Sequence, residues 1–155
     1  MSGSFPHSAT DLPAGYTHRP ALYVLGTPHR LVIDGAPDQV SAARAFVRRV
    51  LGSSHPGADR AVLLTSELVT NSVEHSDSRL PGGTVSVTLQ ATADRVRVEV
   101  ADDGGTSVPT LRSDDVQAEA GRGLRLVNAC SLAWSYHSSA IGTVTWFECG
   151  PEPLP

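Results

Sequence analysis

The sequence predicts a two-layer α+β sandwich in which helices cover one face of a mixed, largely antiparallel sheet. Two segments carry apolar residues at helical spacing, and two later segments alternate apolar and polar residues as half-buried strands do. The chain has 155 residues, of which 40% are hydrophobic and 18% are charged. This length and composition are typical of one compact globular domain, and not of a disordered or coiled-coil protein.

The first part of the chain is predicted to lie outside the domain. Residues 1–20 are rich in Ser, Gly, Pro, His and Thr and have no period, which favours a mobile N-terminal arm. The single domain is expected to span residues 21–150, followed by a tail at 151–155. Short apolar runs at 21–25 and 29–34, separated by a Gly-Thr-Pro turn, predict a hairpin or two edge strands.

Two amphipathic helices are expected next. After a turn at 35–37, apolar residues recur at helical spacing from Val40 to Leu51, and Gly52 ends the segment. The second helix is expected to run from Ala58 to about His75.

The second half of the chain predicts a hairpin, a loop, a helix and two final strands. Alternation over 85–89 and 96–100 indicates two adjacent antiparallel strands. Residues 103–121 are polar and aperiodic, so we expect a functional loop there. A short helix from about 123 to 131 and strands near 133–137 and 143–149 complete the predicted sandwich.

The charged residues exclude several classes of function. All 12 basic residues are arginines, so chemistry that requires a lysine is excluded. The formal net charge is −4, which disfavours direct binding to nucleic acid or to an anionic membrane. The first residues have neither a basic start nor an apolar run, and no later apolar run reaches about 18 residues, so we expect neither secretion nor a membrane span.

The cysteine count favours a reducing compartment. The two cysteines, Cys130 and Cys149, are too few for a disulfide framework, and their apolar surroundings predict buried thiols. We therefore expect a cytoplasmic protein.

A polar stripe on the second helix is the first chemical signal. Glu67, Asn71 and His75 are four residues apart, so successive side chains rise about 6 Å and turn only about 40° around the axis. A solvated helix face is the alternative explanation. We assign His75 to packing or to orienting other groups, because a lone helix histidine is more often structural than a ligand.

The second signal is the strand end VADDGG. Asp102 can accept a hydrogen bond from an exocyclic amine, and Gly104 would let a flat ring approach the backbone. An ordinary Asp-Gly turn is the alternative.

The third signal is the segment EAGRGLRLV. Gly121 and Gly123 enter an apolar helix, whose free N–H groups and positive end can face an anion, with Arg122 and Arg125 adding charge. The glycines could also be purely structural.

In this order, the three signals resemble the GHKL (Bergerat-fold) family of ATP-binding proteins. The segments SELVTNSVEH, VADDG and GRGLRLV are most similar to small stand-alone anti-sigma-factor kinases of actinobacteria. The resemblance covers roughly residues 37–148, and it implies a Bergerat-type ATP-binding fold.

The resemblance also implies a role for each matching residue. Glu67 matches the general base that prepares the attacking hydroxyl, and Asn71 matches the ligand of Mg²⁺. Asp102 matches the carboxylate that binds the adenine amine. The remaining matches lie against the base (Gly104) or contact phosphate (Gly121, Arg122, Gly123 and the backbone of Leu124). Two positions depart from the pattern: Thr106 replaces a frequent glycine, and Gly142 stands where relatives often have a lysine.

The implied function is an ATP- and Mg²⁺-dependent anti-sigma factor that is also a serine/threonine protein kinase. Its partners would be a sigma factor and a small antagonist protein that it phosphorylates, with homodimerisation as an option and an indirect effect on transcription. The alternative is a non-catalytic, nucleotide-switched binding module. A detached sensor histidine kinase domain fits less well, because the chain has no long dimerisation helix with a phosphoacceptor histidine.

Overall fold

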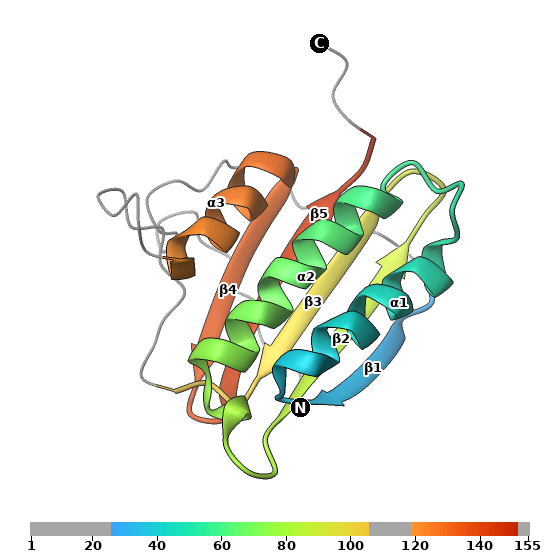
Figure 1. Cartoon of the computed structure of the whole chain (residues 1–155). Helices are drawn as coiled ribbons and strands as arrows, with labels where there is room; N and C mark the ends of the chain where they lie inside the picture. The colour runs from blue at the N-terminus through green and yellow to red at the C-terminus, as the bar shows by residue number, and fades with distance from the viewer. Residues whose placement is uncertain (1–25, 106–118, 152–155) are drawn as a thin grey trace.

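The computed structural model describes residues 26–105 and 119–151. In this part of the chain, a five-stranded sheet has the strand order β1-β2-β3-β5-β4, and the α-helices all lie on one of its faces (Figure 1). The predicted two-layer α+β sandwich is therefore confirmed. The N-terminal residues 1–25, Thr106 and most of the predicted functional loop lie outside the described residues.

The helical layer follows the predicted periodicity closely. It consists of α1 (Val40–Leu51), preceded by the short 3-10 turn η1 (Pro37–Gln39), then α2 (Ala58–His75) and α3 (Glu119–Cys130). A second 3-10 turn, η2 (Asp77–Arg79), leads from α2 into the sheet. Gly52 ends α1 with φ +73°, a left-handed conformation that glycine adopts without a steric penalty.

The strands also lie where alternation predicts them. They are β1 (His29–Asp34), β2 (Thr84–Ala91), β3 (Val96–Asp102), β4 (Ala133–Ser139) and β5 (Gly142–Cys149). The strand predicted at 29–34 is an edge strand, as expected, and it pairs with β2.

The largely antiparallel sheet is confirmed, since every pair of neighbouring strands among the described residues is antiparallel. Two successive helices, α1 and α2, connect β1 to β2 and so return the chain in the opposite direction. One helix, α3, connects β3 to β4, which therefore run in the same direction. β5 inserts between β3 and β4 and pairs with both, so these two parallel strands never become neighbours.

The core lies between the sheet and the helices and is built mainly from Val, Leu and Ala. α2 contributes its central apolar residues, and the sheet contributes one alternating set from each strand. The fully buried side chains include Leu64, Val69, Val85, Val87, Leu89, Val96, Val98, Val127 and Phe147. This continuous core fixes α2 against β3, and so fixes the polar side chains at the edge of the same contact.

The two cysteines differ in burial. Cys149 is buried as predicted, and burial raises the pKa of its thiol to about 12, so the thiol is neutral and unreactive at physiological pH. Cys130 is only half-buried, because it occupies the last residue of α3, so the prediction of a second buried thiol was wrong.

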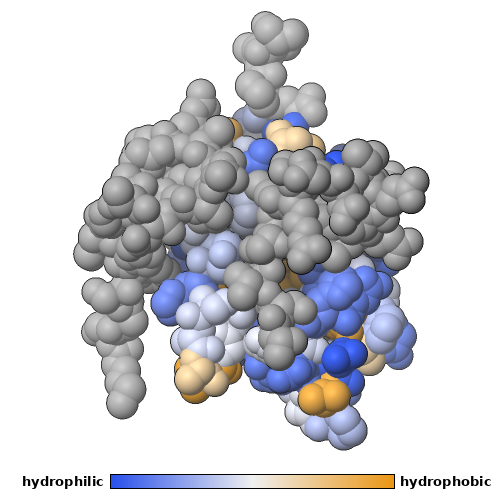
Figure 2. Space-filling view, turned by 90° about the vertical axis from the view of Figure 1, so that its left-hand side faces the viewer, coloured by the Kyte–Doolittle hydropathy of each residue, from blue (hydrophilic) through white to orange (hydrophobic). Residues whose placement is uncertain are grey.

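The described surface carries few large apolar side chains. Only Val32, Leu63, Leu80 and Ile141 are exposed among the described large hydrophobic residues. Figure 2, which views the left-hand side of Figure 1, shows a mostly hydrophilic described surface with small hydrophobic areas. Within residues 26–105 and 119–151, no helix combines the length and the hydropathy that crossing a membrane requires.

Candidate functional site

Two residues of the predicted polar stripe meet the glycine-rich start of α3. Glu67 and Asn71 are half-buried on α2, which packs against α3. A Cβ at Gly123 would lie 2.9 Å from Glu67 Oε2 and 3.4 Å from Asn71 Nδ2. These two polar groups therefore occupy the space that any side chain at residue 123 would need. The structure brings together three of the residues that the sequence singled out.

The start of α3 differs from the prediction. The helix begins at Glu119 rather than near Gly123, so Gly121, Arg122 and Gly123 lie within its first two turns instead of in a preceding turn. The first four N–H groups of a helix have no intrahelical partner, and that of Gly121 is one of them. Leu124 is 3% exposed, so its side chain belongs to the core.

His75 does not share the buried environment of the other two stripe residues. Its side chain is 42% exposed at the last residue of α2, with Nε2 3.7 Å from the exposed carboxylate of Glu74. Our assignment of His75 to packing was therefore wrong. The last turn of α2 still buries Ser72 and Val73, whereas the side chains of Glu74 and His75 in the same turn are exposed.

Asp102 is held in a fixed orientation at the end of β3. The hydroxyl of Ser72, on α2, donates a hydrogen bond of 2.7 Å to Asp102 Oδ2. The backbone N–H of Gly104 donates one of 2.8 Å to Oδ1. The carboxylate is thus tied to the helical layer by one oxygen and to its own strand end by the other.

The surroundings of Asp102 act in opposite directions on its acidity. Burial is the largest influence and raises the pKa of Asp102, and the neighbouring charge of Asp103 adds to the rise. The hydrogen bonds from Ser72, Gly104 and the backbone of Thr143 oppose it, because they favour the ionised form. The result is a half-buried carboxylate whose pKa lies above its ordinary value.

Two glycines allow the backbone to approach closely beside Asp102. Gly104 has φ +72°, and a Cβ placed on it would lie 3.1 Å from the Cα of Gly142. Gly142 has φ +150°, and any side chain on it would overlap the carbonyl oxygen of Asp102. The structure therefore gives a physical reason for a glycine, and not a lysine, at residue 142.

One turn of α2 joins the two halves of the site. Asn71 faces Gly123 of α3, and the next residue, Ser72, is bonded to Asp102 of β3. The polar groups of the helix stripe and of the strand end are therefore parts of one arrangement. Among the described residues, no group of three or more His, Cys, Asp or Glu side chains could hold a metal ion by itself.

Sequence reasoning missed Ser72. The residue is 6% exposed and lies among the buried apolar positions of α2, such as Leu68, Val69 and Val73. A hydroxyl at a core-facing helical position was a usable signal, since buried polar groups are usually hydrogen-bonded. The signal could not have identified Asp102 as its partner.

Replacing Ser72 with Ala is expected to raise the pKa of Asp102 further, because it removes a hydrogen bond to the ionised form. An acid whose pKa is raised in the folded state favours folding below its ordinary pKa, and loses that contribution as the pH rises through the folded value. The variant should therefore lose about 1 kcal/mol of stability at neutral pH and less in acid.

An NMR titration of the Asp102 carboxyl, with urea unfolding at several pH values, measures both effects. Ser41→Ala is the control, because its hydroxyl donates to the backbone oxygen of Asp38 on the exposed surface. An unchanged Asp102 titration in Ser72→Ala would show that the hydrogen bond does not stabilise the carboxylate.

A family model matches most of the chain. Residues 33–149 match the family model described as the histidine kinase-like ATPase domain. No curated protein matches the sequence at a significant level.

Solved structures resemble this chain at low sequence identity. The crystal structure of the RsbU and RsbW domains of Rv1364c from Mycobacterium tuberculosis is 22% identical with a TM-score of 0.56, over 80% of this chain and 32% of that one. The histidine kinase domain of the blue-light activated histidine kinase EL346 from Erythrobacter litoralis is 20% identical with a TM-score of 0.48, over 74% of this chain and 60% of that one. The chain thus spans less than two thirds of either protein, and the first likeness shows a common fold.

Proposed function

Because the chain belongs to the histidine kinase-like ATPase domain family, we propose that it binds ATP between α2, the end of β3 and the start of α3. The observation that carries this proposal is the single turn of α2 on which Asn71 faces Gly123 and Ser72 holds Asp102. The proposed binding domain spans residues 21–150, with the arm and the tail outside it.

Asp102 is proposed to recognise the adenine base. Its carboxylate is fixed by Ser72 and Gly104, and it can accept a hydrogen bond from the exocyclic amine. Gly104 has no side chain, so the base can lie against the backbone at this position. A preorganised acceptor of this kind favours adenine over a base that presents a carbonyl oxygen there, because two acceptors would face each other.

The triphosphate is proposed to lie between α2 and the N-terminal turns of α3. The free N–H groups there, including that of Gly121, and the positive end of the helix favour phosphate, and we assign Arg122, Gly123 and the backbone of Leu124 to the same contact. Mg²⁺ would neutralise phosphate charge when bound. Asn71 supplies an amide oxygen that suits this hard ion, and the phosphates would supply most of the other ligands.

We further propose that the chain is an anti-sigma factor and a serine/threonine protein kinase. Its substrate would be a small antagonist protein, and Glu67 would accept the proton of the attacking hydroxyl. The similarity of SELVTNSVEH to anti-sigma-factor kinases supports this, as does the half-buried position of Glu67 beside Gly123. The net charge of −4 favours a protein partner over nucleic acid or membrane, in the cytoplasm, with homodimerisation as an option.

One observation favours a second candidate, a nucleotide-switched binding module without catalysis. The chain has no lysine, and Gly142 packs against the backbone of Asp102 where relatives often carry a cation. Charge stabilisation of a transferring phosphoryl group would then depend on arginine, the helix terminus and the metal. Binding without turnover requires less of this stabilisation.

A calorimetric titration with ATP, with and without Mg²⁺, tests the binding proposal. We expect saturable binding of one ATP per chain, tighter with Mg²⁺. An ATP labelled at the γ-phosphate, incubated with the protein and candidate antagonists from the neighbouring genes, then separates the two functions. Label transfer to a serine or threonine supports the kinase, binding without transfer supports the module, and no binding of ATP contradicts both.

A further inference from the structure

The 3-10 turn η2 connects the last turn of α2 to the sheet, at the end that carries Asp102. Two serines of this turn are buried, since Ser76 is 6% exposed and Ser78 is 1% exposed. Ser76 is the N-cap of η2, and its hydroxyl accepts a hydrogen bond of 3.1 Å from the backbone N–H of Ser78. The same hydroxyl donates to the carbonyl oxygen of Ser72 at 2.6 Å. η2 is therefore fixed to the end of α2.

The hydroxyl of Ser78 lies between two strands. It donates a hydrogen bond of 2.7 Å to the carbonyl oxygen of Thr84 in β2, and it accepts one of 2.9 Å from the backbone N–H of Asp103, which follows β3. The pairing of β2 with β3 ends at Ser86 and Ala101. Two residues further along, the same register would place Thr84 opposite Asp103, where backbone groups of antiparallel strands can bond to each other. The hydroxyl takes the place of that direct contact, so the strands separate here.

η2 also holds the residue that follows Asp103. The backbone N–H of Asp77 donates a hydrogen bond of 2.6 Å to the carbonyl oxygen of Gly104. The N–H of Gly104 in turn donates to Asp102 Oδ1. Residues 72–78 thus hold three consecutive residues: Asp102 through Ser72, Asp103 through Ser78, and Gly104 through Asp77.

The backbone of Ser78 is enclosed by two other turns. Gly35 follows β1, and Gly83 precedes β2. A side chain on either glycine would overlap the carbonyl oxygen of Ser78. These close approaches are possible only because glycine has no side chain, and they leave η2 little room to shift.

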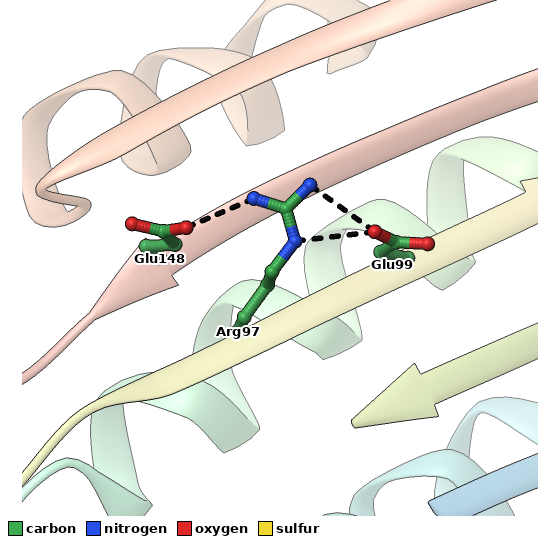
Figure 3. A network of polar contacts seen from close by, with 3 residues as sticks. All are labelled: Arg97, Glu99 and Glu148. Atoms are coloured by element: carbon green, nitrogen blue, oxygen red, sulfur yellow. Dashed lines mark hydrogen bonds and ion pairs between the residues drawn. The ribbon is translucent and has the colours of Figure 1, made fainter. Parts of the chain in front are cut away.

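β3 is fixed on its other side by β5. Their pairing continues to Asp102, which lies opposite Thr143. Near the start of β3, Arg97 donates to Glu148 of β5 at 2.9 Å and to Glu99 at 3.1 Å (Figure 3). β3 therefore stays in place on β5 up to Asp102, and the contacts with η2 determine the path of the next two residues.

We propose that Ser78 is a positioning residue for recognition of the base, an inference that rests on the proposed ATP site. Ser78 is almost fully buried, so it acts through the backbone that it holds and not by touching the ligand. Without its hydroxyl, the N–H of Asp103 can bond directly to the carbonyl oxygen of Thr84. The ladder would then close by one more pair and draw Gly104 toward β2, away from Asp102 Oδ1.

The variant Ser78→Ala tests this inference on the full chain. Ser76→Ala is the matched control, because it also removes a buried hydroxyl with two hydrogen bonds from the same turn, and neither bond reaches β2 or β3. Urea unfolding of both variants measures how far each change destabilises the protein. Ser78→Cys keeps a side chain of similar size with a weaker donor and acceptor, and it replaces Ser78→Ala if that variant does not fold.

The first measurement uses the protein without nucleotide. We expect hydrogen exchange at the amides of Asp103 and Gly104, followed by NMR, to be about tenfold faster in Ser78→Ala than in Ser76→Ala, as the loss of one hydrogen bond implies. The carboxyl of Asp102 should titrate at a higher pH in Ser78→Ala, because the hydrogen bond from Gly104 favours its ionised form. Unchanged exchange and titration in Ser78→Ala would overturn the inference.

The second measurement is calorimetry with Mg²⁺ and either ATP or inorganic tripolyphosphate, which has no base. We expect Ser78→Ala to bind ATP roughly tenfold more weakly and tripolyphosphate as the unmodified protein does, because the bonds of Ser78 reach the end of β3 and not α3. Ser76→Ala should keep both affinities.

Two calorimetric results would overturn the inference. Equal losses of ATP affinity in Ser76→Ala and Ser78→Ala would mean that the stability of the turn, and not the position of Gly104, governs binding. An equal loss for ATP and for tripolyphosphate in Ser78→Ala would mean that the change does not act on the base. A failure of the proposed function is distinguished from both, because the unmodified protein would then bind no ATP.

Discussion

Replacing Glu67 with Gln is expected to lower the rate of phosphate transfer to a protein hydroxyl by about 10² to 10⁴-fold, the usual contribution of a general base. Gln has the same shape as Glu, so it fits the space beside Gly123 where a Cβ would lie 2.9 Å from Glu67 Oε2. It cannot accept the proton of the attacking hydroxyl. The affinity for ATP should therefore stay nearly constant while the rate falls.

Initial rates with γ-labelled ATP and a partner that is phosphorylated by the unmodified protein measure this effect. Glu74→Gln is the matched control, because it removes the same charge from the same helix at a side chain that is 49% exposed. Transfer that proceeds undiminished in Glu67→Gln would eliminate the general-base assignment while leaving ATP binding intact. Equal losses in both variants would point to overall charge as the cause.

Local periodicity predicted most elements of this fold, although not the start of α3. The spacing of apolar residues in α2 defined both of its ends, and alternation placed β2 and β3, because each pattern reports which face of one element is buried. Local periodicity could not predict that β3 and β4 are parallel but not neighbours in the sheet. That relation depends on β5, which comes last in the sequence yet inserts between them, and no local pattern encodes the insertion.

The candidate site also has contacts that local spacing predicts and contacts that depend on long-range packing. Glu67 and Asn71 could be paired from sequence because helical geometry fixes residues four apart on one face. The contact between Ser72 and Asp102 joins residues 30 positions apart and depends on how α2 packs on the sheet. His75 continued the helical spacing but not the environment, since its side chain is exposed although Ser72 and Val73 of the same turn are buried. Sequence spacing thus predicts which side chains share a face, and packing decides which of them are enclosed.

Replacing Asp102 with Asn is expected to weaken ATP binding by at least about 2 kcal/mol, or roughly 30-fold. The carboxylate has two accepting oxygens, which receive hydrogen bonds from Ser72 and Gly104. An asparagine has one accepting oxygen and an NH₂ group in place of the other. If the NH₂ group takes the place of Oδ1 it faces the backbone N–H of Gly104, and if it takes the place of Oδ2 the Ser72 hydroxyl loses the oxygen to which it donates. An NH₂ group that points toward the ligand also opposes the adenine amine.

The matched control for this change is Asp103→Asn, one residue along the chain. It removes the same charge, and Asp103 Oδ2 accepts from the backbone N–H of Thr84 at an exposed position rather than facing α2. Calorimetry should therefore give a large loss of ATP affinity for Asp102→Asn and a small one for Asp103→Asn. Losses of equal size would mean that long-range charge, and not a directed hydrogen bond to adenine, governs affinity at this end of β3. Full affinity in Asp102→Asn would mean that the base binds elsewhere in the chain.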